Sequence, residues 1–183
     1  AQGAVFGNIV LAANAVLLNF QTFMAHALDG FAHSAEAMGG RAVGARDRTA
    51  FRHAVLVSMF WGMITAIAFA LLYLVAGPTI VAMLTSIKEV QTAASNYIVW
   101  SVVMPLVAVF PFVFDGVFLG ATRGRTMRNA MIVSVAVYIA CCLTLIPSLG
   151  NHGLWAALLI FMGIRGITLG ARYPALERSI GRT

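Results

Sequence analysis

Charged side chains are scarce in this sequence. Acidic and basic residues together make up 10% of its 183 residues, whereas a soluble domain carries about 25%. Hydrophobic residues account for 61% of the chain. Because so few charges cannot cover the surface of a soluble domain, the composition excludes an ordinary soluble protein. It predicts a polytopic membrane protein.

Cysteine is almost absent, and so is a recognisable leader. The two cysteines, Cys141 and Cys142, are neighbours in an apolar run, and adjacent residues rarely reach disulfide geometry. We therefore interpret both as packing residues.

No cleavable signal peptide is visible, because polar residues begin where an apolar core and a cleavage site are expected. The first spanning helix would serve as its own signal.

Apolar runs predict an all-α membrane bundle of five transmembrane helices, since about 20 residues cross the hydrocarbon layer. The expected boundaries of the helices rest on glycine and proline stops. They include Gly39-Gly40, Gly77-Pro78 and Pro147, with a short amphipathic connector over 78–91 and a turn at 151–153. The expected spans are 4–38, 54–76, 93–120, 130–146 and 154–172.

The basic residues lie in a few short loops, a distribution typical of membrane topology and not of nucleic-acid binding. Ten arginines lie on one side of the predicted membrane, in loops 39–53 and 121–129 and at the C-terminal end, which includes the tail 173–183. The opposite side has Lys88 alone. The positive-inside rule then places this basic side, with the C-terminus, in the cytoplasm and predicts a multi-pass protein of the cell (inner) membrane. The N-terminus would start outside, which together with an initial Ala suggests a missing upstream part.

A polar seam interrupts the first apolar run. Its residues recur at intervals of three and four, so on a helix they share one face. An acidic side chain facing lipid at mid-depth costs roughly 2.5–3.5 kcal/mol, so we expect the seam to face protein or a water-filled cavity. The seam comprises Asn19, Thr22, His26, Asp29, His33 and Glu36.

Several motifs resemble the multidrug and toxic compound extrusion (MATE) transporters. Residues 11–20 and 40–54 are similar to the second helix of a MATE lobe, which ends in a Gly-x-x-x-Gly-Ala pattern, here Gly40, Gly44 and Ala45. The segments 29–37 and 114–131 look most like the DinF-like branch. The resemblance extends from about Gly7 to Arg172. It implies a twelve-helix, two-lobe fold of which these spans are helices eight to twelve.

The resemblance also bears on the coupling residues. Helix seven and the N-terminal lobe would be missing partners of this chain, and with them the proton-binding aspartate of the first helix. The acidic position late in the tenth helix, which some members use for cation coupling, corresponds to Asp115. Pro105 and Pro111 in the same span favour a bent helix.

These residues suggest a cation pathway. Acids and histidines in a membrane cavity can titrate near physiological pH, as proton coupling requires. We expect such a cavity to hold Asp29, His33, Glu36 and Asp115. Aromatic side chains would line it and receive lipophilic cations, and the expected ones are Phe20, Phe23, Trp100 and Phe112.

Structural roles for the same residues stay open. His26 and His33 are equally suited to hydrogen bonds between helices. Glu36, near the cytoplasmic end, is positioned to pair with Arg41 or Arg46. Arg165, in the last turns of the fifth expected span, would extend its guanidinium to the membrane surface.

The sequence therefore predicts a secondary transporter, not an enzyme, that exports organic cations in exchange for protons, or for sodium, and contacts membrane lipids. No cofactor and no metal are expected. One alternative is a truncated or split lobe that needs an N-terminal partner, because the substrate path lies in and between lobes. A remote alternative is an intramembrane metalloenzyme using the histidines and acids of the seam, although a His-Glu-x-x-His motif is absent.

Overall fold

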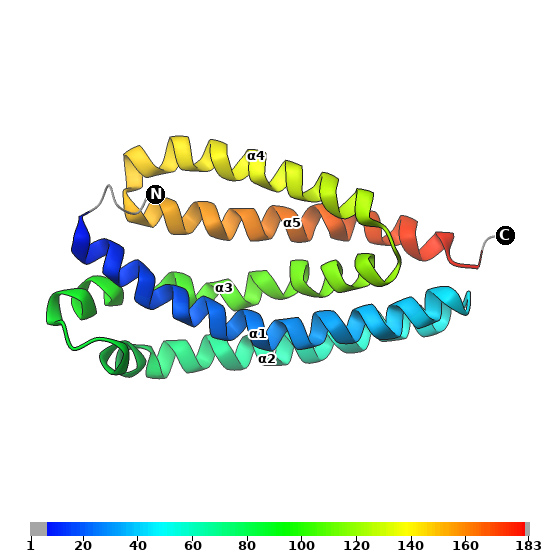
Figure 1. Ribbon diagram of the computed structural model, residues 1–183, viewed down its shortest axis with the longest axis horizontal. Coiled ribbons are helices and arrows are strands. Elements are labelled where there is room, and N and C mark those ends of the chain that lie inside the picture. Colours follow the sequence, from blue (N-terminus) through cyan, green and yellow to red (C-terminus); the bar gives the residue numbers. More distant parts are fainter. Residues whose placement is uncertain (1–6, 182–183) are drawn as a thin grey trace.

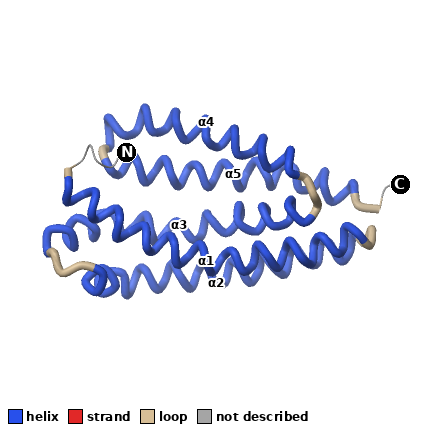
Figure 2. The backbone as a smooth tube through the Cα atoms, viewed as in Figure 1, coloured by secondary structure: helices blue, strands red, loops and turns tan. Residues whose placement is uncertain are grey.

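Five long helices run up and down through the molecule, as the apolar runs predicted. The computed structural model describes residues 7–181 (Figure 1), and within that range it contains helices and short loops but no strand (Figure 2). All five helices are long and apolar enough to cross a membrane. They are α1 (Asn8–Gly44), α2 (Arg48–Leu84), α3 (Lys88–Gly120), α4 (Gly124–Leu149) and α5 (Asn151–Ser179).

The helices extend further than their glycine and proline signals predicted. α1 passes through Gly39-Gly40, α2 contains Pro78 and α4 contains Pro147. The predicted turn at Asn151 is also wrong, because α5 begins there. In an apolar environment the backbone has few partners other than its own helix, so glycine and proline end a helix less readily than they do in water.

The connections are correspondingly short. Asp47 ends the three-residue link between α1 and α2, and its carboxylate accepts a hydrogen bond from the backbone N–H of Ala50 at 2.9 Å, which caps α2. Gly150 alone joins α4 to α5, with φ 59° and ψ −133°. Glycine adopts this conformation without the steric penalty that other residues incur.

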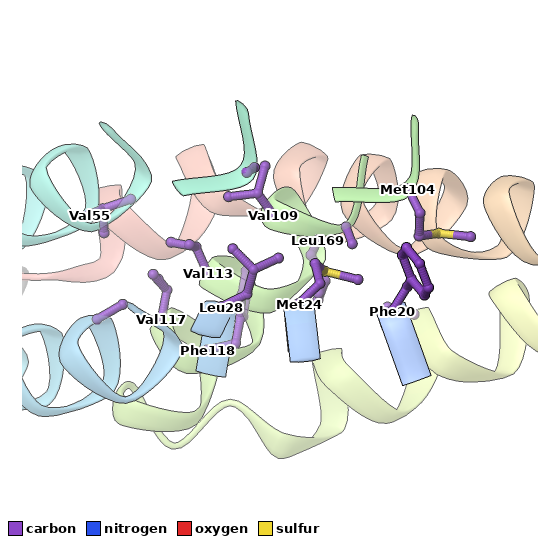
Figure 3. Close-up of a cluster of buried hydrophobic side chains, with 14 of the residues drawn as sticks. Phe20, Met24, Leu28, Val55, Met104, Val109, Val113, Val117, Phe118 and Leu169 are labelled. Carbon is purple, nitrogen blue, oxygen red and sulfur yellow. The ribbon is translucent and has the colours of Figure 1, made fainter. Parts of the chain in front are cut away.

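α3 lies at the centre of the bundle, where it packs against α1, α2 and α5, while α4 packs mainly against α5 (Figure 1). Apolar side chains fill the space around α3. Figure 3 shows this core, with Phe20, Met24 and Leu28 from α1 beside residues of α3. The α3 contribution comprises Met104, Val109, Val113, Val117 and Phe118.

Two glycines of α3 bring its backbone against that of α1. A Cβ atom at Gly116 would collide with the carbonyl group of Ala32, and one at Gly120 would collide with the backbone at Glu36 and Gly40. Small residues allow membrane helices to approach in this way. The close contact fixes the position of the residue that precedes Gly116, which is Asp115.

The two ends of the bundle differ in charge. Because the helices alternate in direction, the ends of α1, α3 and α5 meet the starts of α2 and α4 at one end of the molecule (Figure 1). We call this the basic end. It carries Arg41, Arg46, Arg48, Arg52, Arg123, Arg125, Arg128, Arg172 and Arg178, whereas Lys88 lies at the opposite end.

Candidate functional site

An ion pair joins α3 and α5, two of the helices that are long and apolar enough to cross a membrane. The carboxylate of Asp115 accepts two hydrogen bonds from Arg165, one from Nε at 2.9 Å and one from Nη2 at 2.8 Å. The side chain of Asp115 is 30% exposed and that of Arg165 is 11% exposed. A two-bond contact of this kind fixes the orientation of both groups and is stronger than a neutral hydrogen bond.

Local backbone features bring the two partners together. Gly116 lets α3 approach α1, and Gly166 lets α5 approach Phe110 and Pro111 of α3. The third nitrogen of the guanidinium, Nη1, lies 3.0 Å from the sulfur of Met131 on α4. The ion pair is therefore held from three helices, α3, α4 and α5.

The structure corrects the predicted role of Arg165. We expected its guanidinium to reach the membrane surface, because the fifth span was predicted to end at residue 172. α5 instead continues to Ser179, which places Arg165 well inside the helix. The residue is 9% exposed, and a buried guanidinium requires a charged partner, which Asp115 provides.

A cavity of about 230 Å³ opens beside the ion pair. It is lined by two acids, Asp29 and Asp115, by Arg165, and by apolar side chains. Asp29 is exposed and makes no ion pair among residues 7–181. The three ionised side chains together give the cavity one negative formal charge. Its apolar lining comprises Ala32, Pro111, Phe112, Met131, Phe161 and Met162.

The structure brings together only part of the predicted set. Asp29, Asp115 and Phe112 line the cavity, whereas His33 and Glu36 do not. His33 Nδ1 instead lies 3.5 Å from a carboxylate oxygen of Glu36 on the same helix, and this pair is solvent-exposed. Within residues 7–181, Glu36 makes no ion pair with Arg41 or Arg46, the two arginines expected as its partners.

The remaining polar residues of the seam bond within their own helix. Asn19 donates to the carbonyl of Ala15 at 3.1 Å, and Thr22 donates to that of Leu18 at 3.0 Å. Nδ1 of His26 lies 2.7 Å from the carbonyl oxygen of Thr22. Within residues 7–181, the bonds made by His26 and His33 therefore stay on α1, and the choice between a proton relay and hydrogen bonds to other helices stays a prediction. All the seam residues except Glu36 are exposed in this chain.

Three of the four aromatic residues expected in the cavity lie elsewhere. Phe20 is buried against Tyr73, with ring centroids 4.7 Å apart. Phe23 is 66% exposed on the outside of α1. Trp100 donates a hydrogen bond to His152 at 3.1 Å. Helical spacing alone does not show which side of α1 meets α3, and this explains the error for Phe20 and Phe23.

A second polar contact, between α1 and α5, was not predicted. The amides of Asn14 and Asn151 exchange hydrogen bonds of 2.7 and 2.9 Å, and the indole N–H of Trp155 donates to Asn14 at 3.0 Å. All three residues are at most 7% exposed. A signal was available, since an asparagine within an apolar helix usually bonds to another helix, but the sequence did not identify its partner.

The histidines and acids of the seam do not form a metal site in the structure. Residues 7–181 contain no group of three or more histidine, cysteine or acidic side chains placed to hold a metal ion. His26 and His33 are oriented by bonds within α1. The geometry gives no support to the metalloenzyme alternative.

Five spanning helices, with an ion pair between two of them, define this chain as a multi-pass membrane protein. Residues 3–144 match the MatE family. The chain belongs to this family, as its motifs predicted.

A named relative refines this assignment. The chain is 44% identical over 169 residues to DNA damage-inducible protein F of Escherichia coli (strain K12). The match covers 92% of this chain and 37% of the relative, so the chain spans little more than a third of that protein's length. The similarity agrees with the DinF-like branch predicted from residues 29–37 and 114–131.

Proposed function

We propose that the full-length protein is a secondary transporter of the cell (inner) membrane that exports lipophilic organic cations in exchange for protons. Asp115 is the coupling residue in this proposal. The observation that carries it is the ion pair between Asp115 and Arg165 beside a negatively charged, largely apolar cavity. Membership of the MatE family supports the same class of activity.

The chemistry of the cavity suits a lipophilic cation. Phe112 and Phe161 offer aromatic faces, which attract cations by about 0.5–2 kcal/mol. Met131 and Met162 add polarizable thioethers that adapt to ligands of different shape. Asp29, which makes no ion pair with the residues that the structure describes, adds a negative charge. A hydrophobic molecule carrying one positive charge complements this lining.

Protonation of Asp115 couples release of the organic cation to proton entry in this proposal. With Asp29 and Asp115 ionised and Arg165 positive, the cavity carries one negative formal charge and attracts a cation. A proton on Asp115 removes its attraction for the guanidinium, and the formal charge of the cavity falls to zero. Proton entry then favours release of the organic cation, and proton departure favours binding of the next one. The exchange requires that Asp115 and Arg165 separate once per cycle.

Sodium is the other candidate for the coupling ion. Hard metal cations take several oxygen ligands at once, and the acidic side chains in the cavity lining are Asp29 and Asp115. Both oxygens of Asp115 already accept hydrogen bonds from Arg165. A proton needs one of these oxygens, whereas sodium would need a larger rearrangement, so we favour the proton.

Reconstituted vesicles test the proposal. The full-length protein would be assayed for uptake of a fluorescent lipophilic cation, driven by an imposed proton gradient and, separately, by a sodium gradient. We expect Asp115→Asn to reduce proton-driven transport by at least tenfold, about 1.4 kcal/mol in the rate-limiting barrier. Glu89→Gln is the matched control, because Glu89 lies on the same helix, in its first turn and outside the cavity.

Unchanged proton-driven transport by Asp115→Asn at several pH values would exclude Asp115 as the coupling residue. Transport driven only by the sodium gradient would replace the proton with sodium.

The split-lobe alternative has its own experiment. Residues 1–183 would be expressed alone and together with the N-terminal part of the full-length protein. Transport that appears only on co-expression would show that the five helices need the other lobe.

A further inference from the structure

A second cavity lies between α4 and α5 at the basic end. Its volume is about 440 Å³, compared with about 230 Å³ beside Asp115. It uses a different face of α4, because Ala130 and Val133 line it whereas Met131 lines the first cavity. Its polar lining comprises Arg125, Thr126, Asn129, Thr168 and Arg172.

The two arginines of this cavity have no anionic partner in the part of the chain that the structure describes. Arg125 and Arg172 are exposed and make neither a hydrogen bond nor an ion pair between residues 7 and 181. Other arginines at the same end are held, for example Arg48 by Glu177 at 3.0 Å and Arg123 by Ser179 at 3.2 Å. No acidic residue lines the cavity. Two guanidinium groups facing one space favour an anion that accepts hydrogen bonds from both.

The cavity is apolar on the side away from the arginines. Ala130 and Val133 form part of its wall. Val133 is 47% exposed, and Ala136 and Val137 follow it on the same face of α4 one turn further on, within a helix long and apolar enough to span the membrane. Beside the arginines, Thr126 and Asn129 offer a hydroxyl and an amide to a polar group. The site therefore complements a molecule with an anionic head and a hydrocarbon tail.

We propose that this cavity binds an anionic phospholipid, with the phosphate between Arg125 and Arg172 and the acyl chains along α4. Basic pockets between transmembrane helices bind anionic lipid headgroups by this chemistry. A cavity of about 440 Å³ is within the range of small-molecule sites, about 300–1,000 Å³. The site is separate from the cavity of the proposed transport mechanism, because neither Asp29 nor Asp115 lines it.

Native mass spectrometry of the full-length protein in detergent tests the site. Phosphatidylglycerol would be titrated in, with phosphatidylcholine of the same acyl chains as the zwitterionic comparison. We expect the double variant Arg125→Gln, Arg172→Gln to weaken phosphatidylglycerol binding by about tenfold or more, since each arginine near an anionic lipid contributes about 1 kcal/mol. Binding of phosphatidylcholine should change by less than about twofold.

Two further variants separate a shaped site from general surface charge. Arg128→Gln is the matched control, because Arg128 is an exposed arginine of α4 outside the cavity lining, and it should leave binding unchanged. Ala171→Phe keeps both arginines but fills the cavity, and it should weaken phosphatidylglycerol binding as the double variant does.

Three outcomes with these variants would overturn the proposal. They are unchanged binding in the double variant, an equal loss in Arg128→Gln, and undiminished binding in Ala171→Phe. Glycerol phosphate, which has the headgroup but no acyl chains, would be added as a competitor. If it binds as tightly as the lipid, the cavity is a site for soluble phosphates and not for lipid.

Discussion

Two of the polar contacts between helices, one made by Asn14 and the other by Asp115, differ in charge and in access. Asn14, Asn151 and Trp155 form a neutral contact that is buried from solvent, and their side chains hydrogen-bond to one another. Asp115 and Arg165 form a charged contact that opens onto a cavity. The neutral contact is suited to holding α1 against α5, whereas the charged contact can exchange its partner because a proton or a cation can reach it.

The largest expected effect concerns the packing that positions the charged contact. Gly116→Ala would place a methyl group against the backbone of Ala32, and we expect it to lower the free energy of unfolding by about 3 kcal/mol. Gly30→Ala on α1 is the matched control, because a Cβ there meets open space, and it should be neutral or slightly stabilising. Thermal unfolding in detergent measures both. Equal stability of the two variants would contradict the close contact between α1 and α3.

The next effect tests the energy of the charged contact itself. Arg165→Met removes the partner of Asp115, and we expect a loss of about 2 kcal/mol, reduced from the value for a fully buried pair because Asp115 is partly hydrated. Adding Asp115→Asn should recover about 1 kcal/mol or more of that loss. Strictly additive unfolding energies in this double-mutant cycle would show that the two groups do not interact.

The neutral contact should respond more weakly. Asn14→Leu leaves the amide of Asn151 and the indole of Trp155 without a partner, at about 1–2 kcal/mol. Asn19→Leu is the control, since Asn19 is exposed and, among residues 7–181, bonds only to its own helix. If Asn14→Leu also lowers proton-driven transport more than Arg165→Met does, the assignment of roles to the two contacts is reversed.

The smallest expected effect on stability belongs to Asp29. Asp29→Asn removes an exposed carboxylate of the cavity that has no ion-pair partner within the described residues, so the free energy of unfolding should change by less than about 0.5 kcal/mol. The Kd of the full-length protein for a lipophilic cation should nevertheless rise several-fold, because the cavity loses its formal negative charge. Equilibrium binding of a fluorescent cation, with an uncharged analogue as the comparison, measures this effect.

The sequence was sufficient to predict the five helices, because apolar runs of this length have no other stable arrangement in a bilayer. Their ends were not predictable in the same way. The rules for glycine and proline stops come from chains in water, and they failed at Gly39-Gly40, Pro78 and Pro147.

The candidate site was predicted only in part. Resemblance to the MATE family identified Asp115, and the polar seam identified Asp29, but neither indicated that Arg165 is the partner of Asp115. A partner on a distant helix depends on how the helices rotate and pack, which spacing along one helix does not encode. The misplaced end of the fifth span made the error worse, since it put Arg165 near the surface.

The single-residue link between α4 and α5 has a mechanical consequence. Because Gly150 is the entire connection, the two helices cannot move far apart at that end. A change in the angle between them therefore changes the distance between them most at the basic end. The cavity of Arg125 and Arg172 lies there. A molecule bound in this cavity would limit how closely α4 and α5 approach each other. Because Arg165 lies on α5, the same limit would affect its ion pair with Asp115. The lipid composition of the membrane would then regulate how readily that pair separates.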